Sequence, residues 1–175
     1  HDIDTFVDGA AVKQPGQLTY NIIQKHLTLN DIYTVSNYKL CYDIINLYQE
    51  DGIITEPAGA LAVSGLGLFV KDATMYNENS LSCKTIVCIV SGGNNDIMRY
   101  GEFIEKSLIY RQLIHYYIIK FGQRPGALQS FVNNVLADTG IDIVRFEYLK
   151  KTNKSHGSVL LGIELKQASD IHIFN

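Results

Sequence analysis

The residues best suited to bind a ligand are a serine and two glycines that follow an apolar run: Ser91, Gly92 and Gly93. Residues 84–90, Lys-Thr-Ile-Val-Cys-Ile-Val, are largely β-branched without alternation, which predicts a parallel strand covered on both faces. Open α/β sheets bind ligands at the carboxyl ends of such strands, where glycines let the backbone approach closely. The Ser91 hydroxyl is therefore our candidate for a ligand contact. A plain turn explains Gly-Gly-Asn as well, and this alternative stays open.

The Glu56 carboxylate is a second candidate group, because it directly precedes Pro57. Proline is common at the first position of a helix, so a helix is expected to begin here. In one interpretation the charge of Glu56 stabilises the helix N-terminus by about 0.3–1 kcal/mol. In the other, the carboxylate points into a ligand cleft. Residues 64–67, Ser-Gly-Leu-Gly, follow a helical segment and lack the third glycine of a dinucleotide-binding loop, so we reject that motif.

The segments before Glu56 predict further helices and a strand. A helix is expected to run through His26, a strand to cover residues 31–35, and Ser36 to cap a helix that stops at Gly52. The apolar stripe expected on that helix consists of Leu40, Cys41, Ile44, Ile45 and Tyr48. Cys41 is expected to be a small buried hydrophobe rather than a nucleophile. Gly9, inside a short apolar stretch, predicts a close approach of the backbone.

The last third of the chain predicts the order βαββα. A helical segment of mixed charge, residues 97–113, is expected to connect it to the first part. Three strands are expected, at residues 115–121, 141–150 and 159–165. A helix follows the loop at residues 122–126, and another begins near Gln167. A ferredoxin-like unit needs one more strand, which the sequence does not contain. The domains are therefore placed at residues 1–113 and 114–175.

Composition excludes several classes of function. The chain is 46% hydrophobic with a net charge of −3, so it lacks the basic character of a nucleic-acid-binding protein. Its three cysteines cannot all pair and none has metal-ligand spacing, which favours reduced thiols in the cytoplasm and no metal site. No apolar run approaches the roughly 20 residues of a membrane span, so no membrane association is expected. Both ends read as truncated elements, so a fragment of a longer protein is expected.

Four segments, taken in order, resemble those of biosynthetic threonine dehydratase (threonine ammonia-lyase). They are Thr-Phe-Val-Asp-Gly-Ala-Ala-Val at residues 5–12, Glu-Pro-Ala-Gly-Ala at 56–60, Ser-Gly-Gly-Asn-Asn-Asp at 91–96 and Gln-Arg-Pro-Gly-Ala-Leu at 123–128. The resemblance runs the whole length of the chain. It implies a partial tryptophan-synthase-β-like fold, a parallel sheet with helices, followed by most of one α+β, ferredoxin-like, ACT-like regulatory domain.

The resemblance also implies a pyridoxal-phosphate enzyme that converts L-threonine to 2-oxobutanoate and ammonia in isoleucine biosynthesis. The family's Schiff-base lysine and its glycine-rich phosphate loop have no match here, so the chain alone is expected to be inactive and to hold no catalytic residue. Ser91 is implied to bond the pyridine nitrogen, with Gly92, Gly9 and Glu56 at the cofactor. A neutral hydroxyl leaves that nitrogen unprotonated, which suits β-elimination.

Isoleucine is the effector that the same resemblance implies. A small apolar amino acid needs an apolar pocket and donors for its carboxylate, such as the amides that open a helix. The expected contacts are Arg124, Gly126, Ala127, Leu128, Phe146 and Tyr148. Arg124 has an equally good interpretation as a solvated loop residue. Because the second strand of such a unit lies outside the other two, a pocket between subunits of a homo-oligomer is expected.

Two alternatives stay open at this point. The chain could act as a stand-alone amino-acid-binding module without catalysis, since the lysine is absent. Another pyridoxal-phosphate lyase, such as serine dehydratase, fits the catalytic motifs but not the attached ACT-like unit. A comparison of the turnover of threonine with that of serine would distinguish a serine dehydratase from a threonine dehydratase.

Overall fold

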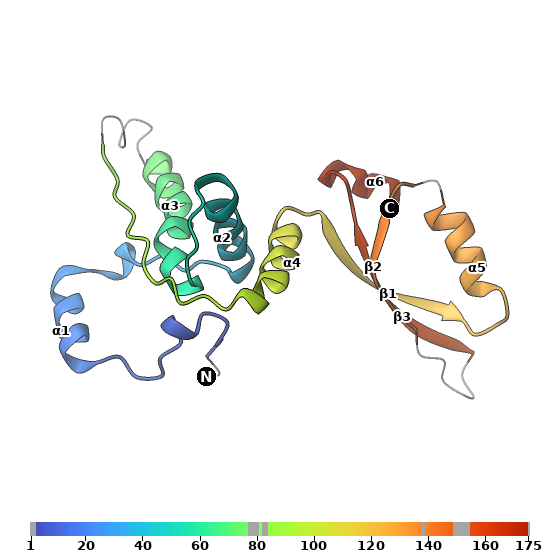
Figure 1. Ribbon diagram of the computed structural model, residues 1–175, viewed down its shortest axis with the longest axis horizontal. Coiled ribbons are helices and arrows are strands. Elements are labelled where there is room, and N and C mark those ends of the chain that lie inside the picture. Colours follow the sequence, from blue (N-terminus) through green and yellow to red (C-terminus); the bar gives the residue numbers. More distant parts are fainter. Residues whose placement is uncertain (1–2, 77–80, 82–83, 138, 149–154, 175) are drawn as a thin grey trace. The chain divides into compact units, whose positions relative to one another are not determined.

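The computed structural model describes residues 3–76, 81, 84–137, 139–148 and 155–174 (Figure 1). The chain forms two compact units, His1–Ser107 and Leu108–Asn175, and each has its own hydrophobic core. None of the helices in the described part of the chain is both long and apolar enough to cross a membrane.

Helices and short turns of helix build the described part of the first unit. They are η1 (Asp8–Ala10), α1 (Gln17–His26), η2 (Leu29–Asp31), α2 (Asn37–Asp51), α3 (Pro57–Tyr76), η3 (Ile97–Arg99) and α4 (Tyr100–Tyr110). The core forms where α2, α3 and α4 contribute fully buried side chains: Leu40, Cys41 and Ile44 from α2, Ala60 from α3 and Phe103 from α4. The start of α3 at Pro57 and the end of α1 at His26 confirm the sequence predictions.

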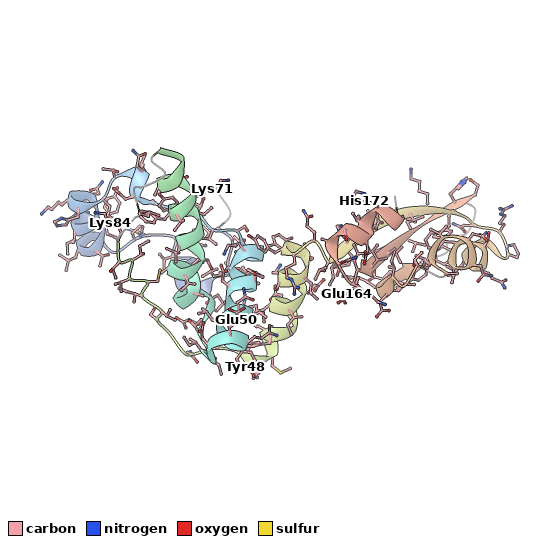
Figure 2. The ribbon with its side chains drawn as sticks, turned by 90° about the horizontal axis from the view of Figure 1, so that it is seen from above. Tyr48, Glu50, Lys71, Lys84, Glu164 and His172 are labelled. Atoms are coloured by element: carbon pink, nitrogen blue, oxygen red, sulfur yellow. The ribbon has the colours of Figure 1, made fainter. Side chains whose placement is uncertain are left out.

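Both predicted caps of α2 are confirmed. The Ser36 hydroxyl accepts a hydrogen bond from the Lys39 amide at 3.2 Å, and Gly52 has the left-handed φ of 67° that ends a helix without steric cost. The predicted apolar stripe is wrong at Tyr48, which is 50% exposed near the end of α2 (Figure 2). The buried stripe includes Leu47 instead, because Leu40, Ile44 and Leu47 follow the i, i+4, i+7 spacing of one helix face.

Two strand predictions in the first unit are wrong. Residues 31–35 end a short turn of helix and continue as irregular chain, and residues 84–90 form neither strand nor helix. Val87 and Ile89 are 81% and 75% exposed, so this run is not the covered strand that its side chains predict. A strand needs a neighbour to pair its backbone groups, and the described residues of this unit supply none.

The second unit holds an antiparallel sheet of three strands, β1 (Ile114–Gly122), β2 (Asp142–Tyr148) and β3 (His156–Glu164), in the order β1-β3-β2. After β1 come α5 (Ala127–Phe131) and a π-helical turn, η4 (Val132–Leu136), and after β3 come η5 (Ala168–Asp170) and α6 (Ile171–Phe174). The βαββα order and the outer position of the second strand are confirmed. The third strand begins three residues earlier than expected, and part of the expected second strand, residues 149–150, lies outside the described residues.

The core of the second unit follows the alternation of β3. Leu161 and Ile163 are fully buried, and Phe131 of the helical segment and Phe146 of β2 pack against them. Because the side chains of a strand alternate between faces, this one apolar row fixes which face the helices cover. Helices on a small antiparallel sheet are compatible with an ACT-like regulatory domain. A parallel sheet is not present among the described residues.

Candidate functional site

The first candidate site lies where residues 91–92 meet the start of α3. The Thr55 side chain is 1% exposed, and its hydroxyl lies 3.0 Å from the Ser91 carbonyl oxygen and 3.2 Å from that of Gly92. The Glu56 amide donates to the Gly92 carbonyl at 2.9 Å. These bonds, made by a buried hydroxyl and a backbone amide, hold the backbone of Ser91 against the helix. Thr55 is a residue that the sequence reasoning missed.

Two glycines make this close approach possible. A Cβ atom on Gly59 would overlap the Ser91 carbonyl oxygen, and one on Gly92 would overlap the Glu56 carboxyl group. Gly92 also has a φ of +69°, which L side chains rarely adopt. Gly59 belongs to the motif at residues 56–60, but its spacing in the sequence gave no sign that it would touch Ser91.

The four residues predicted for the cofactor gather at this point. Gly9 in η1 reaches α3 as well, since a Cβ on Gly9 would lie 3.0 Å from the Ala58 Cβ. Ser91, Gly92 and Gly9 are exposed and Glu56 is half-buried. Among the described residues, the Ser91 hydroxyl has no hydrogen-bond partner, so its proton is available to a ligand.

A network of polar side chains adjoins the contact between residues 91–92 and the start of α3, which we call the corner. The Asn95 side-chain amide donates to the Thr55 carbonyl at 2.7 Å and to the Tyr100 hydroxyl at 3.2 Å. Burial raises the pKa of Tyr100, which therefore remains a neutral phenol. Across the described residues, no three His, Cys, Asp or Glu side chains gather as metal ligands would. At this corner, the Ser91 hydroxyl is an exposed and neutral hydrogen-bond donor.

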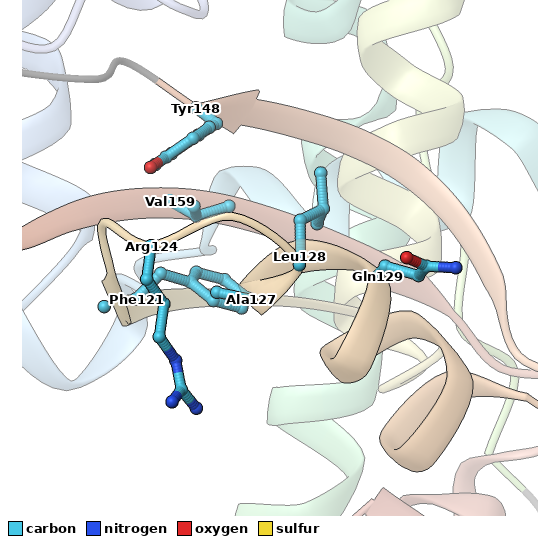
Figure 3. Close-up of a pocket in the computed structure, with 9 residues that line it drawn as sticks. Phe121, Arg124, Ala127, Leu128, Gln129, Tyr148 and Val159 are labelled. Atoms are coloured by element: carbon cyan, nitrogen blue, oxygen red, sulfur yellow. The ribbon is translucent and has the colours of Figure 1, made fainter.

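The second candidate site, called here the effector hollow, lies beside the loop after β1. Its volume is about 400 Å³, and it is lined by Phe121, Gly122, Arg124, Gly126, Ala127, Leu128, Gln129, Tyr148 and Val159 (Figure 3). The Phe121 ring packs edge-on against Phe131 at 5.0 Å between ring centroids and against Tyr148 at 6.4 Å. The lining of the effector hollow is mainly apolar, which suits a small aliphatic side chain.

The structure brings five of the six predicted effector contacts to this hollow and leaves out Phe146. The Phe146 side chain packs into the sheet core, because its strand position faces Leu161. Val159 and Gln129 line the hollow without having been predicted. In Figure 3 the Arg124 guanidinium points away from Tyr148, so it does not face the apolar part of the hollow.

Tyr148 reaches the loop within a single chain although β2 is not adjacent to β1. Gly157 of β3 leaves the space for this, since a Cβ on Gly157 would lie 3.1 Å from a ring carbon of Tyr148. Gly126 caps α5 with a φ of 82°, and the Ala127 amide donates to the Arg124 carbonyl at 3.3 Å. The predicted amide donor at Ala127 is therefore already engaged. A pocket between subunits stays a prediction, but Tyr148 does not require one.

Comparison with known protein families identifies the second unit. Residues 105–175 match the family model of the C-terminal regulatory domain of threonine dehydratase. The matched residues include the end of α4, the sheet and the effector hollow described above.

The chain as a whole is similar to proteins named L-threonine dehydratase biosynthetic IlvA. It is 51% identical over 170 residues to the protein of Halalkalibacterium halodurans. The aligned residues make up 97% of this chain and 38% of that relative. Identity to the Bacillus subtilis protein is 46% over 168 residues, or 96% of this chain and 37% of the relative. A Staphylococcus epidermidis protein is 46% identical over 170 residues. The resemblance inferred from the four motifs is confirmed, and the chain spans less than two-fifths of these relatives.

Proposed function

We propose that this chain serves in a biosynthetic threonine dehydratase, which deaminates L-threonine to 2-oxobutanoate and ammonia and is inhibited by isoleucine. The observation that carries the proposal is the 51% identity over 97% of the chain to a protein named for that enzyme. The regulatory-domain match at residues 105–175 supports the regulatory half of the proposal. Because the chain spans 38% of that relative, the activity is assigned to the complete enzyme and not to this chain alone.

The corner at the start of α3 fits the ring edge of pyridoxal phosphate. The Ser91 hydroxyl would donate to the pyridine nitrogen, and the glycines at positions 59 and 92 let the backbone of Ser91 lie against the start of α3. When bound, the cofactor supplies an electron sink for the elimination. A neutral donor keeps the ring nitrogen unprotonated, and the backbone bonds from Thr55 and Glu56 hold that donor in place. Glu56 and Gly9 would border the same cleft.

The partial tryptophan-synthase-β-like fold belongs to this proposal too. Residues 84–90 expose β-branched side chains that would be covered in a parallel sheet. We infer that their partner strands lie in the part of the enzyme that this chain does not span. We place the complete enzyme in the cytoplasm as a homo-oligomer. The two described cysteines, Cys41 and Cys88, are free thiols, as expected in a reducing compartment.

Isoleucine is assigned to the effector hollow. Val159, Leu128 and the two aromatic rings of Phe121 and Tyr148 would contact its side chain, and the volume of about 400 Å³ is ample for one small amino acid. Burying an aliphatic side chain of this size contributes about 1.5–3 kcal/mol. Binding couples to catalysis if the active and inhibited states differ in affinity, with a typical coupling of about 1–3 kcal/mol.

Turnover by the complete enzyme tests the catalytic proposal. Formation of 2-oxobutanoate from L-threonine, measured with and without isoleucine, should be faster than pyruvate formation from L-serine and should fall when isoleucine is added. Equal turnover of the two substrates would favour a serine dehydratase. An enzyme that turns over threonine without any response to isoleucine would refute the regulatory half.

The stand-alone amino-acid-binding module remains a second candidate function. It is favoured by the hydrophobic core of the second unit, Leu161, Ile163 and Leu165, whose members all belong to that unit. The mass of the native polypeptide separates the two functions, since only the dehydratase requires a chain of roughly the relatives' length.

A further inference from the structure

A second hollow adjoins the effector hollow and carries a different chemistry. We call it the basic hollow: its volume is about 540 Å³, and Lys120 of β1, Arg124 of the loop and His156 of β3 line it. It shares Phe121, Gly122, Arg124 and Ala127 with the effector hollow, but Tyr148, Leu128 and Val159 do not line it. Three basic groups from three separate segments therefore meet at one surface depression.

These basic groups have no acidic counterpart. Among the described residues, no Asp or Glu lines the basic hollow. Neither Lys120 nor Arg124 forms an ion pair with any residue that the structure describes. The second unit is also basic by its sequence, although the whole chain is acidic. Residues 108–175 contain eight of the chain's 15 Lys and Arg residues but only five of its 18 Asp and Glu residues. The charges of Lys120 and Arg124, which have no counter-ion among the described residues, create a positive potential that attracts an anion.

Part of the lining of the basic hollow is apolar. Phe131 and Val135 of the helical segment line it together with Phe121, and the two phenylalanine rings are in edge-on contact at 5.0 Å. The Asn134 side-chain amide donates to the Ser130 hydroxyl oxygen at 3.0 Å. The Ser130 hydroxyl proton has no acceptor among the described residues, so it is available to a ligand. A bare inorganic anion would leave these apolar side chains uncovered.

We propose that the basic hollow binds a small organic acid with a short apolar body and no amino group, such as a 2-oxo acid. The carboxylate would meet Lys120 and Arg124, and the apolar body would lie on Phe131 and Val135. An α-amino acid fits worse, because its ammonium is attached to the carbon next to the carboxylate and would enter the same cluster of basic groups. The site goes beyond the effector proposal, since Lys120, Phe131 and Val135 do not line the effector hollow, and it holds whether or not isoleucine binds.

The test compares two ligands that share one carbon skeleton. 2-Oxobutanoate and 2-aminobutanoate are titrated separately into the full 175-residue chain, and binding is followed by calorimetry and by backbone amide shifts. Saturable binding of 2-oxobutanoate is expected, with shifts at residues 120, 124 and 156. A charged group in a hydrogen bond is worth about 1.5–3 kcal/mol, so Lys120→Gln should weaken binding about tenfold or more. Val135→Glu, which places an acid in the lining of the hollow, should weaken binding of 2-oxobutanoate at least as much.

Lys166→Gln is the matched control, because Lys166 is an exposed lysine of the same unit that lines neither hollow. It should leave the affinity for 2-oxobutanoate unchanged. Equal affinity for the two ligands, equal weakening by Lys166→Gln, or no saturable binding would overturn the proposal. Isoleucine is titrated in parallel into Tyr148→Ala, so that a failure of the effector site is seen separately from a failure of the basic hollow.

Discussion

Replacing Gly59 by alanine tests the geometry that positions Ser91. Alanine normally stabilises a helix by about 0.5–1 kcal/mol relative to glycine. At this position of α3, however, the new Cβ would overlap the Ser91 carbonyl oxygen, which belongs to the backbone and cannot rotate away. The loop must move, and three hydrogen bonds hold it: Thr55 hydroxyl to Ser91, Glu56 amide to Gly92 and Ser91 amide to Gly59.

The size of the effect follows from these bonds. Each contributes about 0.5–1.5 kcal/mol net, so their loss, less the gain in helix propensity, should destabilise the first unit by about 0.5–4 kcal/mol. Gly65→Ala is the matched control, because Gly65 lies in the same helix and a Cβ there meets nothing within 4 Å. That variant should be more stable than the parent by about 0.5–1 kcal/mol.

Amide hydrogen exchange is the suitable assay, because the chain has two units and a single unfolding transition cannot be assumed. The amides of Leu40 and Ile44 in α2, whose side chains are buried in the core, are expected to report the opening free energy of the first unit. If Gly59→Ala protects these amides as well as Gly65→Ala does, residues 91–92 do not lie against α3, and the account of the Ser91 site is wrong.

Three further outcomes follow from the structure. In the complete enzyme, Ser91→Ala should lower threonine turnover by at least about tenfold while changing stability by no more than about 1 kcal/mol, because it removes one ligand contact and no internal side-chain bond; unchanged turnover would remove Ser91 from the cofactor site. Burial raises the pKa of the Cys41 thiol to about 12 from its usual 9.0, so the group is protonated in the folded chain, and its contribution to stability should be complete below about pH 9 and lost as the pH rises toward 12. In a Cys83→Ser background, iodoacetamide at pH 8 should modify Cys88 well before Cys41, as read by peptide mass; equal rates would contradict the burial of Cys41. Borohydride treatment of this chain with pyridoxal phosphate should leave no stoichiometric adduct at one lysine, and such an adduct would show a Schiff-base site here.

The sequence predicted local structure best where one short signal decides it. Ser36, Gly52 and Pro57 mark helix ends by their own backbone chemistry, and the structure confirms all three. The run at residues 84–90 misled because strand formation depends on a partner, which its side chains cannot specify. Local patterns predict what a segment can do by itself, but not which neighbour it finds.

The candidate sites show the same division. The motif residues Glu56, Ser91 and Gly92 lie together in the structure, and their role at a cofactor stays a prediction. Thr55 and Gly59 were found only through three-dimensional contacts. At the effector hollow, the register of β2 against β3 decides the roles of two aromatic residues. Phe146 faces Leu161 in the core, whereas Tyr148 lies at the strand end and crosses over Gly157 to the loop. The identity of both residues was visible in the sequence, but not the register.

Isoleucine binding to the 175-residue chain tests the central claim most directly, because the effector hollow lies wholly within the second unit. Calorimetry should show saturable binding at one site, with the largest amide shifts at residues 121–129, 148 and 159. Tyr148→Ala should reduce the affinity by about tenfold or more, since it removes one apolar wall of the hollow. Tyr20→Ala, a tyrosine of the first unit that lines neither hollow, should leave the affinity unchanged. Isoleucine binding that persists at full affinity in Tyr148→Ala, or that shifts amides elsewhere, would contradict the assignment of the effector site.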